Sequence, residues 1–464
     1  MKVHLSAICG TAMASLAGLL RERGHEVTGS DQDVYPPMST QLRDLGIDIR
    51  SPYHADNVPA EADVVVIGNA LSRGNPEVEV VLDRKQRAVS MPALLADEFL
   101  RGRTSIVIAG THGKTTTTSL AAFLLDRAGV SPSFLVGGVP VDFGRSYRLG
   151  SGPHFVVEGD EYDCAFFDKR PKFVHYLPDI AVIGNVEYDH ADIYADLPAV
   201  ETAFRRLLGV IPRRGRLIAG MESPAVARLV RDAPCAVDTF GLEEGATWCA
   251  ADVATVDGVT RFRLVRAGED LGSFTSPLVG DHNLRNVLAA IATCVAAGIE
   301  PEALRGPLAA FRGVKRRLEL RGRARDVAVY DDFAHHPTAV QATLDALRAV
   351  GSGGRLVAVF EPRSYTSRTR VFLDDFARAL SGADLSVIAA AHLPGKVPAG
   401  ERLSETELVE AIRGLGARAE FWPGVPEIVE RLAAEARPGD VIAVLSNGGF
   451  GGIHDKLLDA LGRP

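Results

Sequence analysis

The sequence lacks a long apolar run, a basic surplus and any paired cysteine spacing. No stretch reaches the roughly 20 apolar residues of a membrane helix, and the apolar N-terminus up to Leu20 is broken by polar residues, which disfavours a signal peptide. With 51 basic against 59 acidic residues, the net charge of -8 argues against nucleic acid as a partner. The five scattered cysteines predict buried thiols in a reducing compartment. We therefore expect a cytoplasmic protein without a membrane segment.

Aromatic residues are also few, at 6%, whereas apolar residues make up 46% of the chain. This composition is typical of an α/β enzyme, and 464 residues exceed what a single core usually holds. Short apolar runs that alternate with helical patterns predict three α/β domains. They are a Rossmann-like N-terminal domain over 1–102, a central P-loop domain with a parallel sheet over 103–313, and a Rossmann-like C-terminal domain over 314–464. We expect 213–280 to form a small antiparallel patch.

One glycine-rich stretch organises the rest of the chain. The residues Gly110–Thr118, GTHGKTTTT, follow an apolar run and precede a helical pattern over Ser119–Ala128. Strand, glycine loop and helix form the context in which such a loop binds nucleotide phosphates. Lys114 would face the terminal phosphates, and the hydroxyl of Thr115 would bind Mg²⁺. Ile108 stands where the usual eight-residue form has a glycine, so the loop is a shortened variant.

Two further strand ends are expected beside this loop. Glu158 follows an apolar run that starts at His154, and His190 comes shortly after the run Ile180–Ile183. Because ligands bind at the carboxyl ends of parallel strands, Glu158 and His190 are candidates to complete a Mg²⁺ site with Thr115. A helix cap and a surface histidine are the alternative interpretations.

The N-terminal domain offers a second nucleotide site. Asp31 lies about 20 residues after the turn at Gly10, where βαβ units place an acidic residue on a ribose hydroxyl. The turn has one glycine instead of three, which disfavours a nicotinamide dinucleotide and suits a single nucleotide such as a uridine. Asn69 and Ala70 end a later strand and would face the same ligand. A plain capping role explains Asp31 equally well.

Two polar patterns come later in the chain. Asn283 and Asn286 lie three residues apart on one helical face, where they would bind an amide or purine edge, or cap the helix. Basic residues crowd 312–325, a pattern that usually marks a solvated face or a linker.

The order of these motifs resembles that of the Mur ligases, over essentially the whole chain. The resemblance implies a three-domain, ATP-dependent amide ligase of peptidoglycan synthesis. Its motifs are Ser30–Asp31, GTHGKTTTT, EGDEYD at Glu158–Asp163, NVEYDH at Asn185–His190, GDHNLRN at Gly280–Asn286 and DDFAHHP at Asp331–Pro337.

Within the family, the chain looks most like the enzymes that join UDP-N-acetylmuramate to the tripeptide L-alanyl-γ-D-glutamyl-meso-diaminopimelate in cell-wall recycling. Tyr365 and the run from Ser367 to Thr369 are instead closer to the relatives that add L-alanine, which stay an alternative. The features that favour the tripeptide are Ser30–Thr40, Ala165–Tyr176, Glu361–Ser364 and Ser446–His454.

The resemblance implies roles for individual residues. It assigns the ATP phosphates to Gly110, Thr111, His112, Gly113, Lys114, Thr115, Thr116 and Arg317, the adenine side to His282, Asn283 and Asn286, and magnesium to Thr115, Glu158 and His190. It places Asp332 and His335 where the C-terminal domain closes over ATP, and the UDP sugar at Gly10, Thr11, Asp31, Asn69 and Ala70. It places the peptide near Arg363, Ser446 and Asn447, with Arg368, Arg370 and Lys396 as weaker candidates. The catalytic residues would be Lys114, Glu158, His190, Arg317 and His335. The basic crowd becomes a hinge and phosphate clamp.

The expected chemistry is activation of a carboxylate. A carboxylate does not react with an amine at neutral pH, so the γ-phosphoryl of ATP would form an acyl phosphate that the amine attacks. Several Mur ligases bind a second magnesium through a carbamoylated lysine, but this chain has no lysine from Phe173 to Val314. A nucleotide-dependent regulator that makes no amide is an alternative of another class. The sequence leaves the oligomeric state open.

Overall fold

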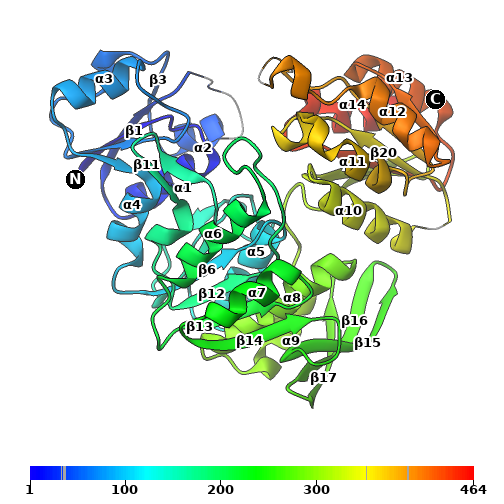
Figure 1. Ribbon diagram of the computed structural model, residues 1–464, viewed down its shortest axis with the longest axis horizontal. Coiled ribbons are helices and arrows are strands. Elements are labelled where there is room, and N and C mark those ends of the chain that lie inside the picture. Colours follow the sequence, from blue (N-terminus) through cyan, green and yellow to red (C-terminus); the bar gives the residue numbers. More distant parts are fainter. Residues whose placement is uncertain (33, 35–37, 352, 394, 396, 464) are drawn as a thin grey trace.

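The computed structural model describes residues 1–32, 34, 38–351, 353–393, 395 and 397–463. These residues form three α/β lobes in chain order, each built on a sheet of mainly parallel strands (Figure 1). The predicted α/β class with three domains is confirmed. Four residues of the Ser30–Thr40 motif, 33 and 35–37, lie outside the described residues, and so does Lys396.

The N-terminal lobe is a doubly wound parallel sheet with the strand order β3-β2-β1-β4-β5. Along β4, Val64 and Val66 join one hydrophobic cluster while Val65 and Ile67 join another, so alternate side chains are buried on opposite faces. The elements are β1 (Lys2–Ser6), α1 (Thr11–Glu22), β2 (Glu26–Ser30), α2 (Met38–Asp44), β3 (Ile49–Arg50), η1 (Ala55–Asn57), β4 (Val64–Ile67), α3 (Pro76–Asp83), β5 (Ala88–Ser90), α4 (Met91–Leu95) and η2 (Ala96–Leu100).

The central lobe has a larger sheet with the order β17-β16-β15-β14-β13-β12-β6-β9-β7-β8. Strand β6 lies between β12 and β9 and is parallel to both, so the carboxyl ends of all three meet at one edge. The elements of this sheet and its helices are β6 (Thr104–Ala109), α5 (Lys114–Arg127), β7 (Ser133–Leu135), β8 (Tyr147–Arg148), β9 (His154–Gly159), β12 (Ile180–Ile183), α6 (Leu197–Leu208), β13 (Arg216–Gly220), α7 (Pro224–Leu229), β14 (Ala236–Gly241), β15 (Trp248–Val256), β16 (Val259–Arg266), β17 (Glu269–Ser276), α8 (Asp281–Ala296) and α9 (Pro301–Ala309).

Two predictions for this lobe are wrong in part. The segment 213–280 is not wholly antiparallel, because β13 and β14 extend the parallel sheet and antiparallel pairing is confined to β15, β16 and β17. Helix α5 begins at Lys114 and not at Ser119. Threonines are weak helix formers, but Thr115–Thr118 are buried, and packing of α5 against α8 overrides that preference.

The C-terminal lobe has the strand order β18-β19-β23-β20-β21-β22, in which β18 is antiparallel to β19 and the other pairs are parallel. Hydrophobic clusters lie on both faces of this sheet: Ala358 and Phe360 join one, and Val357 and Val359 the other. The elements are β18 (Glu319–Ala324), β19 (Val327–Asp332), α10 (Pro337–Val350), β20 (Leu356–Phe360), α11 (Leu373–Leu380), β21 (Leu385–Ile388), α12 (Glu405–Gly414), β22 (Ala419–Phe421), α13 (Val425–Glu435), β23 (Val441–Leu445) and α14 (Ile453–Gly462).

A hairpin of the central lobe reaches the N-terminal lobe (Figure 1). Phe166, at the turn of this hairpin, packs against the N-terminal cluster that contains Ile67. Phe173, just after the hairpin, lies in the same cluster as Leu95 of α4. The hairpin therefore joins the two lobes through apolar contacts. Its elements are β10 (Asp163–Ala165) and β11 (Asp168–Pro171), followed by η3 (Lys172–His175).

Two expectations from composition can be compared with the described residues. Among them, no helix combines the length and the apolar character needed to cross a membrane. All five cysteines are unpaired; Cys164 and Cys294 are buried, but Cys9, Cys235 and Cys249 are only partly buried. The expectation of buried thiols therefore holds for two of the five.

The packing of α1 on β8 generates the first prediction. A Cβ atom on Gly18 would overlap the ring of Tyr147, so this glycine permits close contact between the first two lobes. We expect Gly18→Ala to cost about 1–3 kcal/mol of overpacking and to lower the midpoint of thermal unfolding. Gly306→Ala, in α9 with no atom within 4 Å of the new Cβ, is the matched control and should stabilise slightly. An unchanged midpoint in Gly18→Ala would contradict the contact.

Candidate functional site

A cavity of about 810 Å³ opens at the carboxyl edge of the central sheet and is also lined by residues of both other lobes. Ala12 and Met91 come from the N-terminal lobe, whereas the glycine loop and α8 come from the central lobe. Most of the predicted nucleotide site lines this cavity. The lining includes Thr111, His112, Gly113, Lys114, Thr115, Thr116, Glu158, His190, His282, Asn283, Asn286, Arg317, Asp332, His335 and Asn447.

Two glycines of the loop between β6 and α5 each combine a positive φ with a close contact to another element. Gly110 has a φ of 138°, and a Cβ there would lie 3.1 Å from the carbonyl oxygen of Asn185. Gly113 has a φ of 79°, and its Cβ would collide with the side chain of Asn286. L-residues rarely adopt either conformation. The loop is therefore held close to the ends of β12 and α8, as a phosphate-binding loop requires.

Lys114 is held under the loop by a carboxylate that the sequence reasoning did not single out. Its Nζ donates to the carbonyl oxygen of Gly110 at 2.6 Å and to Glu161 Oε2 at 3.0 Å. Burial by itself lowers the pKa of Lys114, but Glu161, Asp160 and Glu158 together raise it above its ordinary value. The lysine is therefore a fixed positive charge. Glu161 belongs to the motif EGDEYD, so its place in that motif was the available signal.

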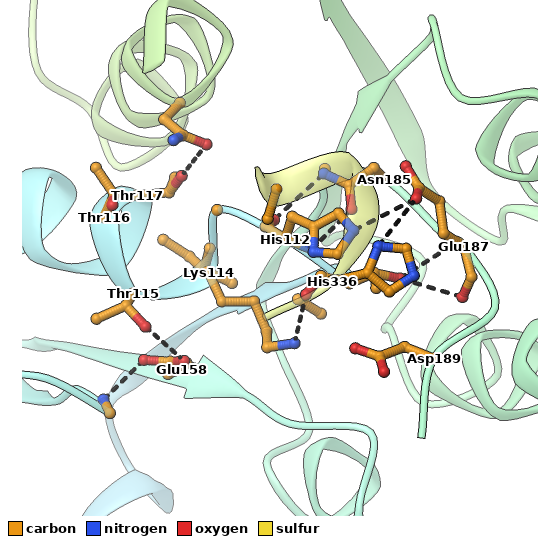
Figure 2. A pocket seen from close by; sticks show the side chains of 18 of the residues that line it. His112, Lys114, Thr115, Thr116, Thr117, Glu158, Asn185, Glu187, Asp189 and His336 are labelled. Atoms are coloured by element: carbon orange, nitrogen blue, oxygen red, sulfur yellow. Dashed lines mark hydrogen bonds and ion pairs between the residues drawn. The ribbon is translucent and has the colours of Figure 1, made fainter. Parts of the chain in front are cut away.

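Thr115 and Glu158 are in contact and form the part of the site best suited to Mg²⁺. The Thr115 hydroxyl donates to Glu158 Oε1 at 3.0 Å and accepts from an Nη atom of Arg317 at 3.1 Å. The backbone N–H of Gly137 donates to the other carboxylate oxygen of Glu158 at 2.7 Å. A hydroxyl beside a carboxylate is a set of hard oxygen donors that fits this ion. Figure 2 shows the two side chains pointing toward each other below the loop.

His190 belongs to a different cluster from Thr115 and Glu158. Its Nε2 lies 3.1 Å from Glu161 Oε1, and Asp160 completes a group whose ligand atoms lie within 4.8 Å of one another. Burial lowers the pKa of His190, but Glu161 and Asp189 outweigh that effect and raise it. The structure thus brings two of the three predicted magnesium ligands together and joins the third to Lys114 through their shared carboxylate.

The asparagines of α8 face the loop and hydrogen-bond within the protein. The Thr117 hydroxyl donates to Asn286 Oδ1 at 3.1 Å, and Asn286 Nδ2 donates to Asn283 Oδ1 at 3.2 Å. Asn283 in turn donates to the carbonyl oxygen of Val279 at 3.0 Å. The two side chains share one helical face, as predicted, and this chain of bonds ties α8 to α5. His282 lies beside them, and burial lowers its pKa to about 4.

The edge of the C-terminal lobe completes the cavity. Asp332 accepts from the backbone N–H groups of Leu318 and Ala334 at 2.6 and 2.8 Å. Burial raises the pKa of Asp332, and burial lowers the pKa of His335 to about 4. Arg317 stacks on the ring of Phe333, with its guanidinium carbon 4.7 Å from the ring centre. Arg317 thereby reaches the loop while anchored to the C-terminal lobe.

Two other basic residues of 312–325, Arg316 and Arg321, make their contacts within the C-terminal lobe. Arg316 donates to the carbonyl oxygens of Ser446 and Gly448, both at 2.6 Å. Arg321 pairs with Asp331 at 3.3 Å. Of the predicted clamp, Arg317 alone among the described residues of this run donates to the glycine loop and the helix it opens.

The predicted peptide residues Ser446 and Arg363 lie beside the contacts of Arg316 with Ser446 and Gly448. Ser446 donates to Glu361 at 2.5 Å, and Arg363 lies 3.7 Å from the same carboxylate. A Cβ on Gly448 would overlap the Arg363 guanidinium. Arg368 is buried and donates to backbone carbonyls, including those of His392 and Leu393. Neither Ser446 nor Arg363 is part of the cavity lining.

The predicted sugar-nucleotide residues gather at the carboxyl edge of the N-terminal sheet, outside the cavity lining. Gly10 and Thr11 start α1, and Asn69 and Ala70 follow β4 as exposed residues. Asp31 is buried and accepts from the N–H of Cys9 at 2.8 Å and from the hydroxyl of Tyr53 at 3.1 Å. Asp31 thus caps a loop, and a ribose contact stays a prediction. Gly110 is also outside the lining.

A contact between the central and C-terminal lobes was not predicted from the sequence. The rings of His112 and His336 pack against each other at a tilt of 43°, with their centres 4.6 Å apart. Glu187 lies 3.4 Å from His112 Nε2 and 3.8 Å from His336 Nδ1. Thr338 also donates to Glu187 at 2.6 Å. Figure 2 shows both rings turned toward this carboxylate. We call His112, Glu187, His336 and Thr338 the lobe latch.

The comparisons with known proteins follow the three lobes. The Mur ligase family, catalytic domain, matches residues 2–102, the Mur ligase middle domain 108–294, and the Mur ligase, glutamate ligase domain, 316–448. The chain is 44% identical to the UDP-N-acetylmuramate–L-alanyl-γ-D-glutamyl-meso-2,6-diaminoheptandioate ligase of Escherichia coli (strain K12), over 100% of this chain and 99% of that protein.

Two other comparisons are also nearly full-length. The crystal structure of a murein peptide ligase from Psychrobacter arcticus superimposes with a TM-score of 0.74 at 35% identity, over 100% of this chain and 99% of that one. The UDP-N-acetylmuramate–L-alanine ligase of Salinibacter ruber is 36% identical over 99% of this chain and 95% of that protein.

The family models and the full-length relative identify an ATP-dependent ligase, and the glycine loop of this chain faces the cavity that all three lobes line. The chain belongs to the Mur ligase family, whose members form amide bonds in the peptidoglycan pathway.

The lobe latch generates a prediction about acid stability. Burial lowers the pKa of His336 to about 4, so between pH 6.5 and 4 the unfolded chain binds a proton that the folded protein does not. The unfolding free energy therefore falls as the pH is lowered through this range, by at most about 3 kcal/mol for this residue. We expect His336→Asn to reduce the slope of unfolding free energy against pH, measured by urea titration.

The control for this measurement is His54→Asn, because His54 is an exposed histidine far from the latch in the N-terminal lobe. Its slope should match that of the parent protein. Equal slopes for His336→Asn and the parent would show that His336 is not held neutral in the folded state.

Proposed function

We propose that this protein joins the tripeptide L-alanyl-γ-D-glutamyl-meso-diaminopimelate to UDP-N-acetylmuramate, with hydrolysis of ATP to ADP and phosphate, in peptidoglycan recycling. The observation that carries the proposal is the full-length match at 44% identity to a protein named for this reaction. The cavity supports it, since residues of all three lobes line one space in which a nucleotide sugar, ATP and a peptide can meet.

We infer that the lobes are the functional units, divided at 102/103 and at 313/314. The first would bind the UDP sugar through Gly10, Thr11, Asp31, Asn69 and Ala70. The second would bind ATP, and the third the peptide. The hinge around Arg316 supports the second division, because its side chain already pairs with the C-terminal lobe.

The charges around the loop suit phosphoryl transfer to a carboxylate. Lys114 carries a fixed positive charge beneath the loop, and Arg317 adds another beside Thr115. Both would neutralise the γ-phosphoryl group as an acyl phosphate forms, after which the peptide amine attacks and phosphate leaves. Thr115 and Glu158 would hold Mg²⁺, which when bound neutralises charge on phosphate oxygens. His190 would position Glu161, and His335 lies on the C-terminal side of the cavity.

Addition of L-alanine to the same UDP sugar is the second candidate. The observation in its favour is Tyr365, which lines the cavity beside Ser364 and Thr366 in a sequence closer to that of alanine-adding relatives. The purified protein should be given Mg-ATP and UDP-N-acetylmuramate with either the tripeptide or L-alanine, and the products weighed by mass spectrometry. We expect the tripeptide adduct; an alanine adduct in its place would overturn the assignment.

Lys114→Ala tests whether the loop carries the reaction. We expect the variant to fold, as judged by its thermal unfolding, and to lose more than about 10³-fold in turnover, because a preorganised charge on the transferred group is removed. Lys456→Ala, an exposed lysine of α14, is the control. If the turnover of Lys114→Ala is close to that of the parent protein, Lys114 has no role in the reaction.

Arg363→Ala tests the peptide site. Loss of a charge-assisted bond to a tripeptide carboxylate should raise the KM for the tripeptide by about 10- to 100-fold, with the KM for ATP unchanged. The control is Arg378→Ala, because Arg378 is exposed, pairs with Asp375 in α11 and has no predicted role at the peptide site. An unchanged tripeptide affinity in Arg363→Ala refutes its role.

A further inference from the structure

Lys172 is a second lysine in the cavity, outside the glycine loop and outside the roles assigned so far. It begins η3, directly after the hairpin, and its side chain is 15% exposed. Its Nζ donates to Asp160 Oδ2 at 2.5 Å and lies 5.7 Å from the centre of the Tyr162 ring. All three side chains line the cavity. Lys172 is therefore a nearly buried cation at the wall of the reaction space.

The hydrogen bonds of the two cavity lysines differ. Lys114 donates to two loop carbonyls and to Glu161, so its N–H donors are already used within the protein. An ammonium group has three N–H donors, and among the described residues Lys172 donates a hydrogen bond to Asp160 alone. Two donors of Lys172 are thus left for a ligand in the cavity. Burial lowers the pKa of Lys172, but Asp160 raises it above its ordinary value, so the group stays charged.

The position of Lys172 indicates from which side its ligand comes. The turn η3 packs on α4 of the N-terminal lobe, and Met91 of α4 lines the same cavity. The adenine side, at Asn283 and Asn286, is formed by α8 of the central lobe, and the predicted peptide residues belong to the C-terminal lobe. Lys172 therefore lies where a ligand bound to the N-terminal lobe would enter the cavity.

We propose that Lys172 binds the carboxylate of the sugar nucleotide and holds it toward the phosphate loop. Glu158, Asp160 and Asp189 also line this cavity, and they would repel an incoming carboxylate that has no cation to meet it. Lys172 supplies that cation, and it also offsets the repulsion between the carboxylate and the γ-phosphoryl group. This inference rests on the proposed function, because it takes a carboxylated sugar nucleotide as the substrate.

The test compares two ligands that differ in the carboxylate. UDP-N-acetylmuramate carries a lactoyl carboxylate that UDP-N-acetylglucosamine lacks, so their dissociation constants are measured by calorimetry with the intact protein. We expect the parent protein to prefer the carboxylated ligand and Lys172→Met to lose about 10- to 100-fold in affinity for it. Affinity for UDP-N-acetylglucosamine and for ATP should not change. Lys169→Met, on the neighbouring strand with an exposed side chain paired to Asp163, is the matched control.

The double variant Asp160→Asn/Lys172→Met covers the case in which the single variant unfolds, since it leaves no unpaired carboxylate at this wall of the cavity. The same selective loss in the double variant supports the proposal, and so does partial recovery in Lys172→Arg. If the double variant keeps the parent's preference for the carboxylated ligand, Lys172 only balances Asp160 and the proposal is overturned. Failure of the proposed function has a separate signature: the parent protein itself would then show no preference and form no amide.

Discussion

The pairing of Lys114 with Glu161 is the interaction on which the site depends. The lysine comes from the first residue of α5, and the glutamate follows the end of β9, so the pair joins two neighbouring elements beneath the glycine loop. The same glutamate also contacts His190, beyond the end of β12. One buried carboxylate thereby sets the positions of a lysine and a histidine, and the glycines allow the loop to pass close enough for the lysine to reach the carbonyl oxygens of Gly110 and Thr111.

Contacts between the lobes form the cavity around this pair. The lobe latch connects the loop residue His112 to the start of α10, while the β10–β11 hairpin attaches the opposite side of the central lobe to the N-terminal sheet. The cavity thus forms only when the three lobes of the chain pack together, since none of them encloses it alone. Acidic side chains are concentrated in the cavity, in a chain that is acidic overall. The few cations there therefore provide much of the attraction for an anionic ligand.

Local motifs were enough to predict the loop, Thr115 with Glu158, and the shared face of Asn283 and Asn286, because strand ends and helical spacing are short-range properties. The pairing of Glu187 with His336 could not be predicted in this way, because it joins residues from different lobes. The start of α5 was misplaced because burial outweighs the weak helix preference of threonine. For Asp31, spacing allowed a ligand contact and a cap equally; its carboxylate accepts from the N–H of Cys9, and the ribose contact stays a prediction.

Arg317 belongs to the connecting segment, yet it donates to Thr115 and stacks on Phe333 of the C-terminal lobe. The linker therefore supplies a side chain that contacts the first turn of α5 as well as joining the two lobes. For protein engineering this restricts where modules can be exchanged. A chimera that takes its C-terminal lobe from a relative has to be cut between Val314 and Arg317, so that the arginine travels with the aromatic ring that supports it and Val314 stays in the central core. A cut after Arg317 would separate that pair and remove the support of the side chain that donates to Thr115.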